Sequence, residues 1–129
     1  MQQKPCPCES GQPYSKCCEV FHSGTVAPNA KTLMRSRYSA YVFGLESYLL
    51  STWHPDTQPE QLSLSGDNAI RWLGLTIKRY AMVNQDNAIV EFVARYKYAD
   101  KLGEKALRLH ETSQFIRMND RWYYVNGDY

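Results

Sequence analysis

All four cysteines of this 129-residue chain lie between positions 6 and 18. They form a Cys-x-Cys pair followed, after a segment containing Gly11 and Pro13, by an adjacent Cys-Cys pair. Four thiols this close in sequence suit a closed tetrahedral site, because Zn²⁺ prefers thiolate ligands and structural zinc sites fill all four positions. The N-terminal segment must then fold back on itself. We therefore predict one structural Zn(II) ion bound by Cys6, Cys8, Cys17 and Cys18.

Disulfides, free thiols and an iron-sulfur cluster are the alternatives to zinc. Disulfides need an oxidising compartment, and residues 1–5 run into the cysteine segment without the apolar stretch of a signal peptide. We therefore expect a cytoplasmic protein with metal-bound thiols. Lys4 and Lys16 flank the cysteines, and we expect their ammonium groups either to offset the negative charge of the thiolates or to be ordinary solvated charges.

The pattern Cys-Pro-Cys-x-Ser-Gly-x-x-Tyr-x-x-Cys-Cys resembles the SEC-C motif. That motif is the zinc knuckle found at the C-terminus of the SecA translocation ATPase and in many other bacterial proteins. The resemblance implies a partner in protein export or translation, such as a SecB-like chaperone or the ribosome. One position departs from the motif. Glu9 stands where glycine is usual, so a residue with a side chain must make a turn that glycine makes freely.

Composition predicts one packed domain and excludes several functions. Hydrophobic residues make up 43% of the chain and aromatic residues 13%, enough for a core, yet no stretch approaches the roughly 20 apolar residues of a membrane span. Fifteen basic and thirteen acidic residues give a formal charge of +2, and four thiolates with one Zn(II) bring it close to zero. DNA binding through phosphate neutralisation is therefore not expected, although a modest basic patch for RNA or the ribosome stays open.

Two helices are predicted between the cysteine segment and residue 55. Asn29 is a suitable N-cap for an amphipathic helix over residues 31–45, whose apolar residues recur every three or four positions. A second, shorter helix over residues 45–53 ends before Pro55. The polar stretch that follows is a connection, and we expect one further short helix over residues 58–64.

From residue 70 the pattern changes to strands rich in β-branched and aromatic residues. Four strands are predicted at 70–83, 88–98, 107–118 and 122–125, with turns at 84–87, 100–103 and 119–120. Helices followed by consecutive antiparallel strands predict an α+β fold, with the helices packed on one face of a curved four-stranded antiparallel sheet.

The order of these elements resembles the cystatin-like cone fold shared by nuclear transport factor two and ketosteroid isomerase. The whole chain is identified as similar to the uncharacterised bacterial YchJ family, which joins a SEC-C knuckle to such a cone. The resemblance implies a zinc knuckle over residues 1–25 and a cone domain over residues 26–129. It rests on five segments: Leu33-Met34-Arg35-Ser36-Arg37-Tyr38, Thr52-Trp53-His54-Pro55, Trp72-Leu73-Gly74-Leu75, Phe92-Val93-Ala94-Arg95-Tyr96 and Trp122-Tyr123-Tyr124.

Folds of this cone type bind small molecules between the helices and the concave sheet face. Glu111 shares the inward face of its strand with apolar residues, so this carboxylate must be paired, hydrogen-bonded or shifted in pKa. We expect a ligand pocket formed by six residues: Arg37, Tyr41, Trp53, His54, Glu111 and Ser113. Further tyrosines, Tyr38, Tyr48 and Tyr124, either line that pocket or belong to the core.

Two functions follow from these features. The first is a non-enzymatic docking module in which the knuckle contacts a protein partner and the cone holds a possible ligand. In that case Glu111 and Arg37 form a buried ion pair joining helix to sheet. The alternative is an isomerase- or dehydratase-like enzyme with Glu111 as general base and Arg37 or a tyrosine stabilising an enolate-like charge. A pocket with room for a ligand favours the alternative, whereas a sealed Glu111–Arg37 pair excludes it.

Overall fold

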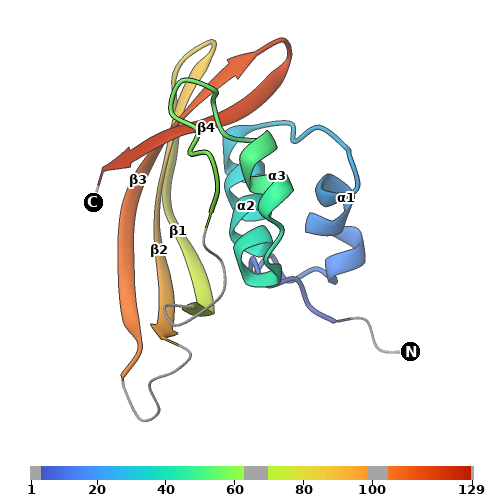
Figure 1. Ribbon diagram of the computed structural model, residues 1–129, viewed down its shortest axis with the longest axis vertical. Coiled ribbons are helices and arrows are strands. Elements are labelled where there is room, and N and C mark those ends of the chain that lie inside the picture. Colours follow the sequence, from blue (N-terminus) through green and yellow to red (C-terminus); the bar gives the residue numbers. More distant parts are fainter. Residues whose placement is uncertain (1–3, 63–69, 99–104, 129) are drawn as a thin grey trace.

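Four antiparallel strands form one sheet in the order β1-β2-β3-β4, and helices cover one of its faces (Figure 1). The computed structural model describes residues 4–62, 70–98 and 105–128. The predicted α+β class and the curved sheet are confirmed. The elements are η1 Tyr14–Lys16, α1 Cys18–His22, α2 Ala30–Phe43, α3 Glu46–Ser51, β1 Ile70–Asn84, β2 Asn87–Tyr98, β3 Leu107–Met118 and β4 Arg121–Asp128.

Helix α2 is the central helix, with α1 on one side and the sheet on the other (Figure 1). Its first turn is capped as predicted, because the Asn29 side chain accepts a hydrogen bond of 2.8 Å from the backbone N–H of Thr32. The helix ends at Gly44, which adopts a left-handed conformation (φ 71°) that glycine takes without strain. It is therefore two residues shorter at its C-terminal end than predicted.

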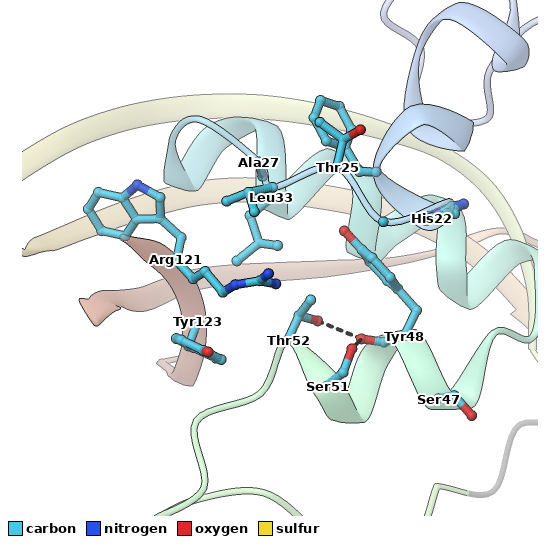
Figure 2. Close-up of a pocket in the computed structure, with 14 residues that line it drawn as sticks. His22, Thr25, Ala27, Leu33, Ser47, Tyr48, Ser51, Thr52, Arg121 and Tyr123 are labelled. Carbon is cyan, nitrogen blue, oxygen red and sulfur yellow. Dashed lines mark hydrogen bonds between the residues drawn. The ribbon is translucent and has the colours of Figure 1, made fainter. Parts of the chain in front are cut away.

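Helix α3 ends earlier than predicted because the chain after it pairs with β4. Tyr124 donates its backbone N–H to the Thr52 carbonyl (2.8 Å), and the His54 N–H donates to the Tyr124 carbonyl (2.7 Å). At the end of α3 the hydroxyls of Ser51 and Thr52 both donate to the carbonyl of Tyr48 (Figure 2). Trp53 is thus held in an extended conformation beside β4.

The short helix predicted over residues 58–64 is wrong for its described part, residues 58–62, which form bends and irregular backbone. Residues 63–64 lie outside the described chain. A backbone contact accounts for the difference: the Leu62 N–H donates to the Glu46 carboxylate (2.7 Å), so this segment is tied to α3 by a side chain instead of by its own helical hydrogen bonds.

The strand predictions hold, with β4 longer than expected. Strand β3 has the predicted bounds, and the turn before β4 places Asn119 and Asp120 at positive φ (52° and 63°), as a tight two-residue hairpin requires. Strand β4 continues to Asp128 because Gly127 and Asp128 pair with Ser113 and Thr112. The turn predicted at 100–103 lies outside the described residues.

Buried cysteines belong to the same apolar cluster as the core between α2 and the sheet. Cys6, Cys8 and Cys18 pack into one cluster that also contains Tyr38 from α2 and Phe92 from β2. The knuckle and the cone therefore share a core, and the division at residues 25 and 26 stays a prediction. No described helix has the length and apolarity needed to cross a membrane.

Candidate metal centre and ligand cavity

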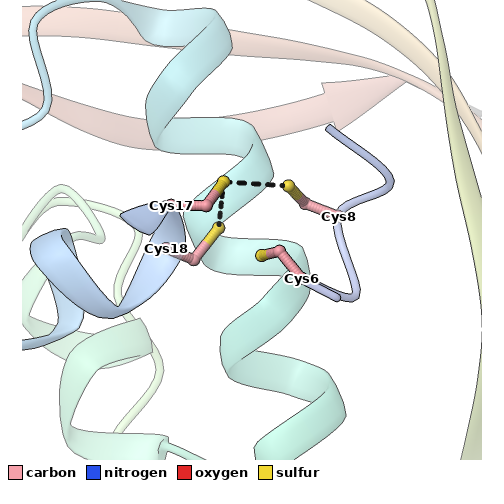
Figure 3. A group of neighbouring side chains, drawn as sticks. All are labelled: Cys6, Cys8, Cys17 and Cys18. Atoms are coloured by element: carbon pink, nitrogen blue, oxygen red, sulfur yellow. Dashed lines mark hydrogen bonds between the residues drawn. The ribbon is translucent and has the colours of Figure 1, made fainter. Parts of the chain in front are cut away.

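The four cysteine sulfur atoms converge on one point beside α2 (Figure 3). All lie within 4.8 Å of one another, and the Sγ atoms of Cys17 and Cys8 are 3.6 Å apart, while those of Cys17 and Cys18 are 4.0 Å apart. Zinc–sulfur bonds of about 2.3 Å at tetrahedral angles place sulfur atoms about 3.8 Å apart. None of the four is disulfide-bonded. The donor set therefore fits a tetrahedral metal ion.

Backbone hydrogen bonds bring the two cysteine pairs together. Cys6 donates its N–H to the Gln12 carbonyl (2.9 Å), and Tyr14 donates to the Lys4 carbonyl (2.9 Å), so the segment folds into a small hairpin bridged at Pro5 and Pro13. The hairpin places the first pair opposite the second, which opens α1. Hydrogen bonds within this segment thus bring the four cysteines together.

Side chains of helix α2 contact the cysteine cluster. The Ser39 hydroxyl lies 3.3 Å from the Cys18 sulfur and 3.5 Å from that of Cys6, and Arg35 donates from Nη1 to the Cys8 carbonyl (2.7 Å). Lys4 and Lys16 are exposed. Arg35 is therefore a cation that the structure places against the segment, and sequence reasoning missed it because it lies far along the chain in a helix.

The four thiols differ in pKa because they lie so close together. Hydrogen bonding from Cys18, followed by weaker contributions from the other cysteines and Ser10, lowers the pKa of the Cys8 thiol to about 4. Burial raises the pKa of Cys17, and the hydrogen bond to Cys8 together with burial raises that of Cys18. Neighbouring thiols thus stabilise one thiolate, and a divalent cation is what allows all four to ionise together.

Glu9 makes the expected turn and also reaches the sheet. Its backbone is left-handed (φ 62°), and its Oε2 accepts a hydrogen bond from the Leu75 N–H of β1 (2.8 Å) and lies 3.5 Å from Nη2 of Arg95. A Cβ on Gly74 would collide with the Arg95 guanidinium, so glycine makes room for this contact. Glu9 therefore ties the cysteine segment to β1.

We expect Glu9→Ala to be less stable than Glu9→Gly by about 1 kcal/mol, because both lose the contacts while only alanine keeps the strain of a left-handed backbone. Urea unfolding of the metal-loaded variants measures the difference. The same two substitutions at exposed Glu19 in α1 should give the opposite order, since glycine is the weaker helix former. Equal stability of the two Glu9 variants would contradict the backbone argument.

A cavity of about 210 Å³ lies between α2 and the concave face of the sheet. Five of the six predicted pocket residues line it, and His54 does not. His54 lies outside because its neighbour Trp53 takes the cavity side of the segment paired with β4. Occupation of the cavity by a ligand stays a prediction. The lining residues are Met34, Arg37, Tyr38, Tyr41, Trp53, Trp72, Phe92, Ala94, Leu109, Glu111, Ser113 and Tyr124.

Glu111 is hydrogen-bonded within the sheet and makes no direct pair with Arg37. It is 6% exposed, and its Oε2 accepts hydrogen bonds from the hydroxyls of Ser113 and Tyr124, the latter at 3.1 Å. The predicted Glu111–Arg37 ion pair is wrong within the described chain, because neighbouring hydroxyls on β3 and β4 satisfy the carboxylate first. Tyr124, expected from the sequence either to line the pocket or to belong to the core, thus also donates a hydrogen bond to Glu111.

Arg37 is 3% exposed and is held by groups that carry no charge. Its Nη1 donates to the Leu49 carbonyl (2.8 Å) and to the Thr52 hydroxyl (2.6 Å), and its guanidinium lies over the rings of Trp53 (5.0 Å) and Tyr124 (4.7 Å). Burial lowers the pKa of Arg37, because desolvation disfavours the charged form. The cavity therefore contains a buried cation without a contacting carboxylate in the described part of the protein.

One buried donor without a partner among the described residues lies in the same wall. The indole N–H of Trp53 is buried and has no hydrogen-bond acceptor among the described residues. Burial also raises the pKa of the Tyr41 hydroxyl, which is hydrogen-bonded to Arg37. The Arg37 side of the cavity therefore has one buried donor, the Trp53 indole N–H, that no described residue satisfies.

A larger hollow of about 390 Å³ lies on the other side of α3, between the α1–α2 connection and the start of β4 (Figure 2). Its polar groups are largely paired with one another: His22 accepts from the Tyr14 hydroxyl (2.6 Å) and donates to the Ser36 carbonyl (2.8 Å), and the Tyr48 and Ser36 hydroxyls lie 2.7 Å apart. We place the candidate ligand site in the smaller cavity, because Trp53, whose buried indole N–H has no partner among the described residues, lines that one.

Comparison with known sequences gives consistent matches. The model of the YchJ middle domain, described as NTF2-like, matches residues 29–127. A UPF0225 protein from Chromobacterium violaceum is 50% identical over 127 residues, which cover 95% of this chain and 90% of that protein. A UPF0225 protein from Xanthomonas oryzae is 44% identical over 127 residues, with 98% and 96% covered.

Solved structures resemble the whole chain, including the knuckle. The solution structure of a SEC-C motif containing protein from Rhodopseudomonas palustris matches with a TM-score of 0.79 at 28% identity, covering 95% of this chain and 96% of that one. The crystal structure of a SEC-C motif containing protein from Psychrobacter arcticus matches with a TM-score of 0.75 at 26% identity, covering 98% and 81%.

Proposed function

Since this chain belongs to the YchJ family, we propose that it is a zinc-stabilised binding protein whose cone cavity holds a small organic molecule. The observation that carries the proposal is the cavity itself, in which Arg37 and Glu111 stand unpaired with each other on otherwise aromatic and aliphatic walls. Apolar cavities with a few converging polar groups are the usual form of small-molecule sites.

Zinc has a structural role in this proposal. Four cysteine ligands leave no position for water or substrate, and the sulfur spacing and reduced thiols support a Cys₄ zinc site. Three of the cysteines are buried against α2, so the ion would fasten the N-terminal segment to the cone. A protein partner in export or translation, implied by the SEC-C motif, remains a further prediction.

The isomerase- or dehydratase-like alternative uses the same cavity, and the room for a ligand beside a Glu111 that is not paired with Arg37 is the outcome that favours it. Its supporting observation is that Ser113 and Tyr124 fix the Glu111 carboxylate beside the space for a ligand. Both functions therefore require binding first. A molecule that binds and is converted by the wild type, but only bound by Glu111→Gln, would favour the enzyme.

The NMR resonances of the tryptophan indole N–H groups test the binding proposal. The chain has three tryptophans, of which Trp53 and Trp72 line the cavity while Trp122 lines the larger hollow. We expect monocyclic organic probes, added to the zinc-loaded protein, to shift the indole N–H resonances of Trp53 and Trp72 and to leave that of Trp122 unchanged. Shifts confined to Trp122, or no shifts with millimolar probes, would contradict the proposal.

A further inference from the structure

The cavity has opposite charges at two places on its wall. Arg37 comes from α2 and Glu111 from β3, and both line the same space without forming an ion pair. The Tyr124 ring lies between them, because it stacks under the guanidinium (4.7 Å) while its hydroxyl donates to the carboxylate (3.1 Å). A ligand in this cavity therefore meets a positive and a negative group at once.

The Arg37 side of the cavity suits a hydrogen-bond acceptor. A guanidinium has five N–H donors; Nη1 of Arg37 donates to Leu49 and Thr52, and the Tyr41 hydroxyl is a further hydrogen-bond partner of this side chain. The buried indole N–H of Trp53, which lies against the same guanidinium, also has no acceptor in the described chain. A carbonyl oxygen placed here would accept a hydrogen bond from this indole N–H, next to the positive charge of Arg37.

The Glu111 side suits a donor and disfavours a second anion. Each kind of ion is attracted by one of the two groups and repelled by the other, so the cavity gives an ion little net compensation for the hydration that it loses on entry. An uncharged molecule with an acceptor near Arg37 and an N–H or O–H donor near Glu111 meets neither repulsion. Charge thus selects against both common classes of small ionic ligand.

Size and wall chemistry limit the ligand further. The cavity of about 210 Å³ exceeds the roughly 150 Å³ of an apolar cavity that accepts benzene, so it has room for one ring and a small substituent. Five of its lining residues are tyrosine or tryptophan, whose faces stack on planar rings. These are Tyr38, Tyr41, Trp53, Trp72 and Tyr124.

We propose, on the basis of the binding function above, that the cavity selects uncharged planar monocyclic molecules that carry an amide-type acceptor and donor pair. Aryl amides and cyclic amides are the chemical class with both groups on one small flat frame. Arg37 and Glu111 are then the residues that determine charge selectivity.

Three probes of nearly equal size test the proposal with the zinc-loaded full chain: benzamide, benzoate and benzylammonium. Titrations followed at the Trp53 and Trp72 indole resonances give the three dissociation constants. We expect benzamide to bind at least about tenfold more tightly than either ion, because each ion loses its hydration while the like charge in the cavity offsets the attraction of the opposite one. A preference of the wild type for benzoate or for benzylammonium overturns the proposal.

Two variants test whether Glu111 and Arg37 determine the charge selectivity of the cavity. Glu111→Gln keeps the shape of the side chain and removes its charge, so benzoate should bind about tenfold more tightly than it does to the wild type. Arg37→Met should weaken benzamide about tenfold and relieve the exclusion of benzylammonium. If the Arg37 variant fails to fold, the Glu111→Gln result decides, and unchanged benzoate affinity there overturns the proposal.

Failure of the two proposals is distinguishable. If none of the three probes shifts Trp53 or Trp72, the binding function fails and this inference fails with it. If a probe binds in the cavity with the wrong order of preference, only the charge selectivity is wrong.

Discussion

Replacing Cys8 by serine should abolish metal binding and destabilise the whole protein. Cys8 is completely buried and shares one apolar cluster with the cone core, so its thiolate cannot be replaced by a ligand from solvent. Most of the binding free energy of a structural zinc site is folding free energy. We expect a loss of about 4 kcal/mol or more, with a fall in Tm of more than about 15 °C.

Metal analysis and thermal unfolding measure the two effects. The zinc content should fall from one ion per chain to none, and a chelator should reproduce the lower Tm in the wild type. Lys16→Ala is the matched control, because Lys16 immediately precedes the second cysteine pair and is exposed. A Cys8→Ser variant with unchanged zinc content, or one that loses zinc at unchanged Tm, would refute the structural role.

Gly127→Ala should cost about 2 to 4 kcal/mol, although it adds a single methyl group. Gly127 pairs with Ser113 across β3 and β4, and a Cβ there would overlap the Glu111 carboxylate and side chain. Glu111 must then leave its position, which breaks the hydrogen bonds from Ser113 and Tyr124. A buried carboxylate without these donors is costly.

A double-mutant cycle isolates this effect. In the Glu111→Ala background the collision is absent, so Gly127→Ala should change the free energy of unfolding by less than about 1 kcal/mol. Urea unfolding of the four proteins gives the interaction term. An equally large loss in both backgrounds would mean that glycine is needed for the backbone of β4 and that the contact with Glu111 is irrelevant.

Local patterns were enough to predict most of the fold. The cysteine spacing identified the four clustered thiols, Asn29 marked the start of α2, and the alternating residues of β3 gave its bounds. Each of these signals acts between neighbours in sequence. The two-residue turn before β4 was also readable, because asparagine and aspartate tolerate positive φ.

Interactions between distant residues were not predictable in this way. The pattern showed that Glu111 must be satisfied but not that Tyr124 would do so in place of Arg37. Strand β4 extends through Gly127, a residue with little strand propensity, because pairing with β3 outweighs propensity. Glu9 was recognised as an unusual turn residue, whereas its bond to Leu75 depends on how the knuckle packs.

Each outer strand of the sheet has part of its open edge covered by another segment of the chain. The segment around Trp53 lies along β4, and the Glu9 carboxylate occupies the free N–H of Leu75 on β1. Open strand edges are templates for aggregation, and natural proteins cover them. Since Glu9 lies in the metal-binding turn, we expect loss of zinc to release the Leu75 contact on β1 as well as to loosen the core, so that the stripped protein self-associates more readily.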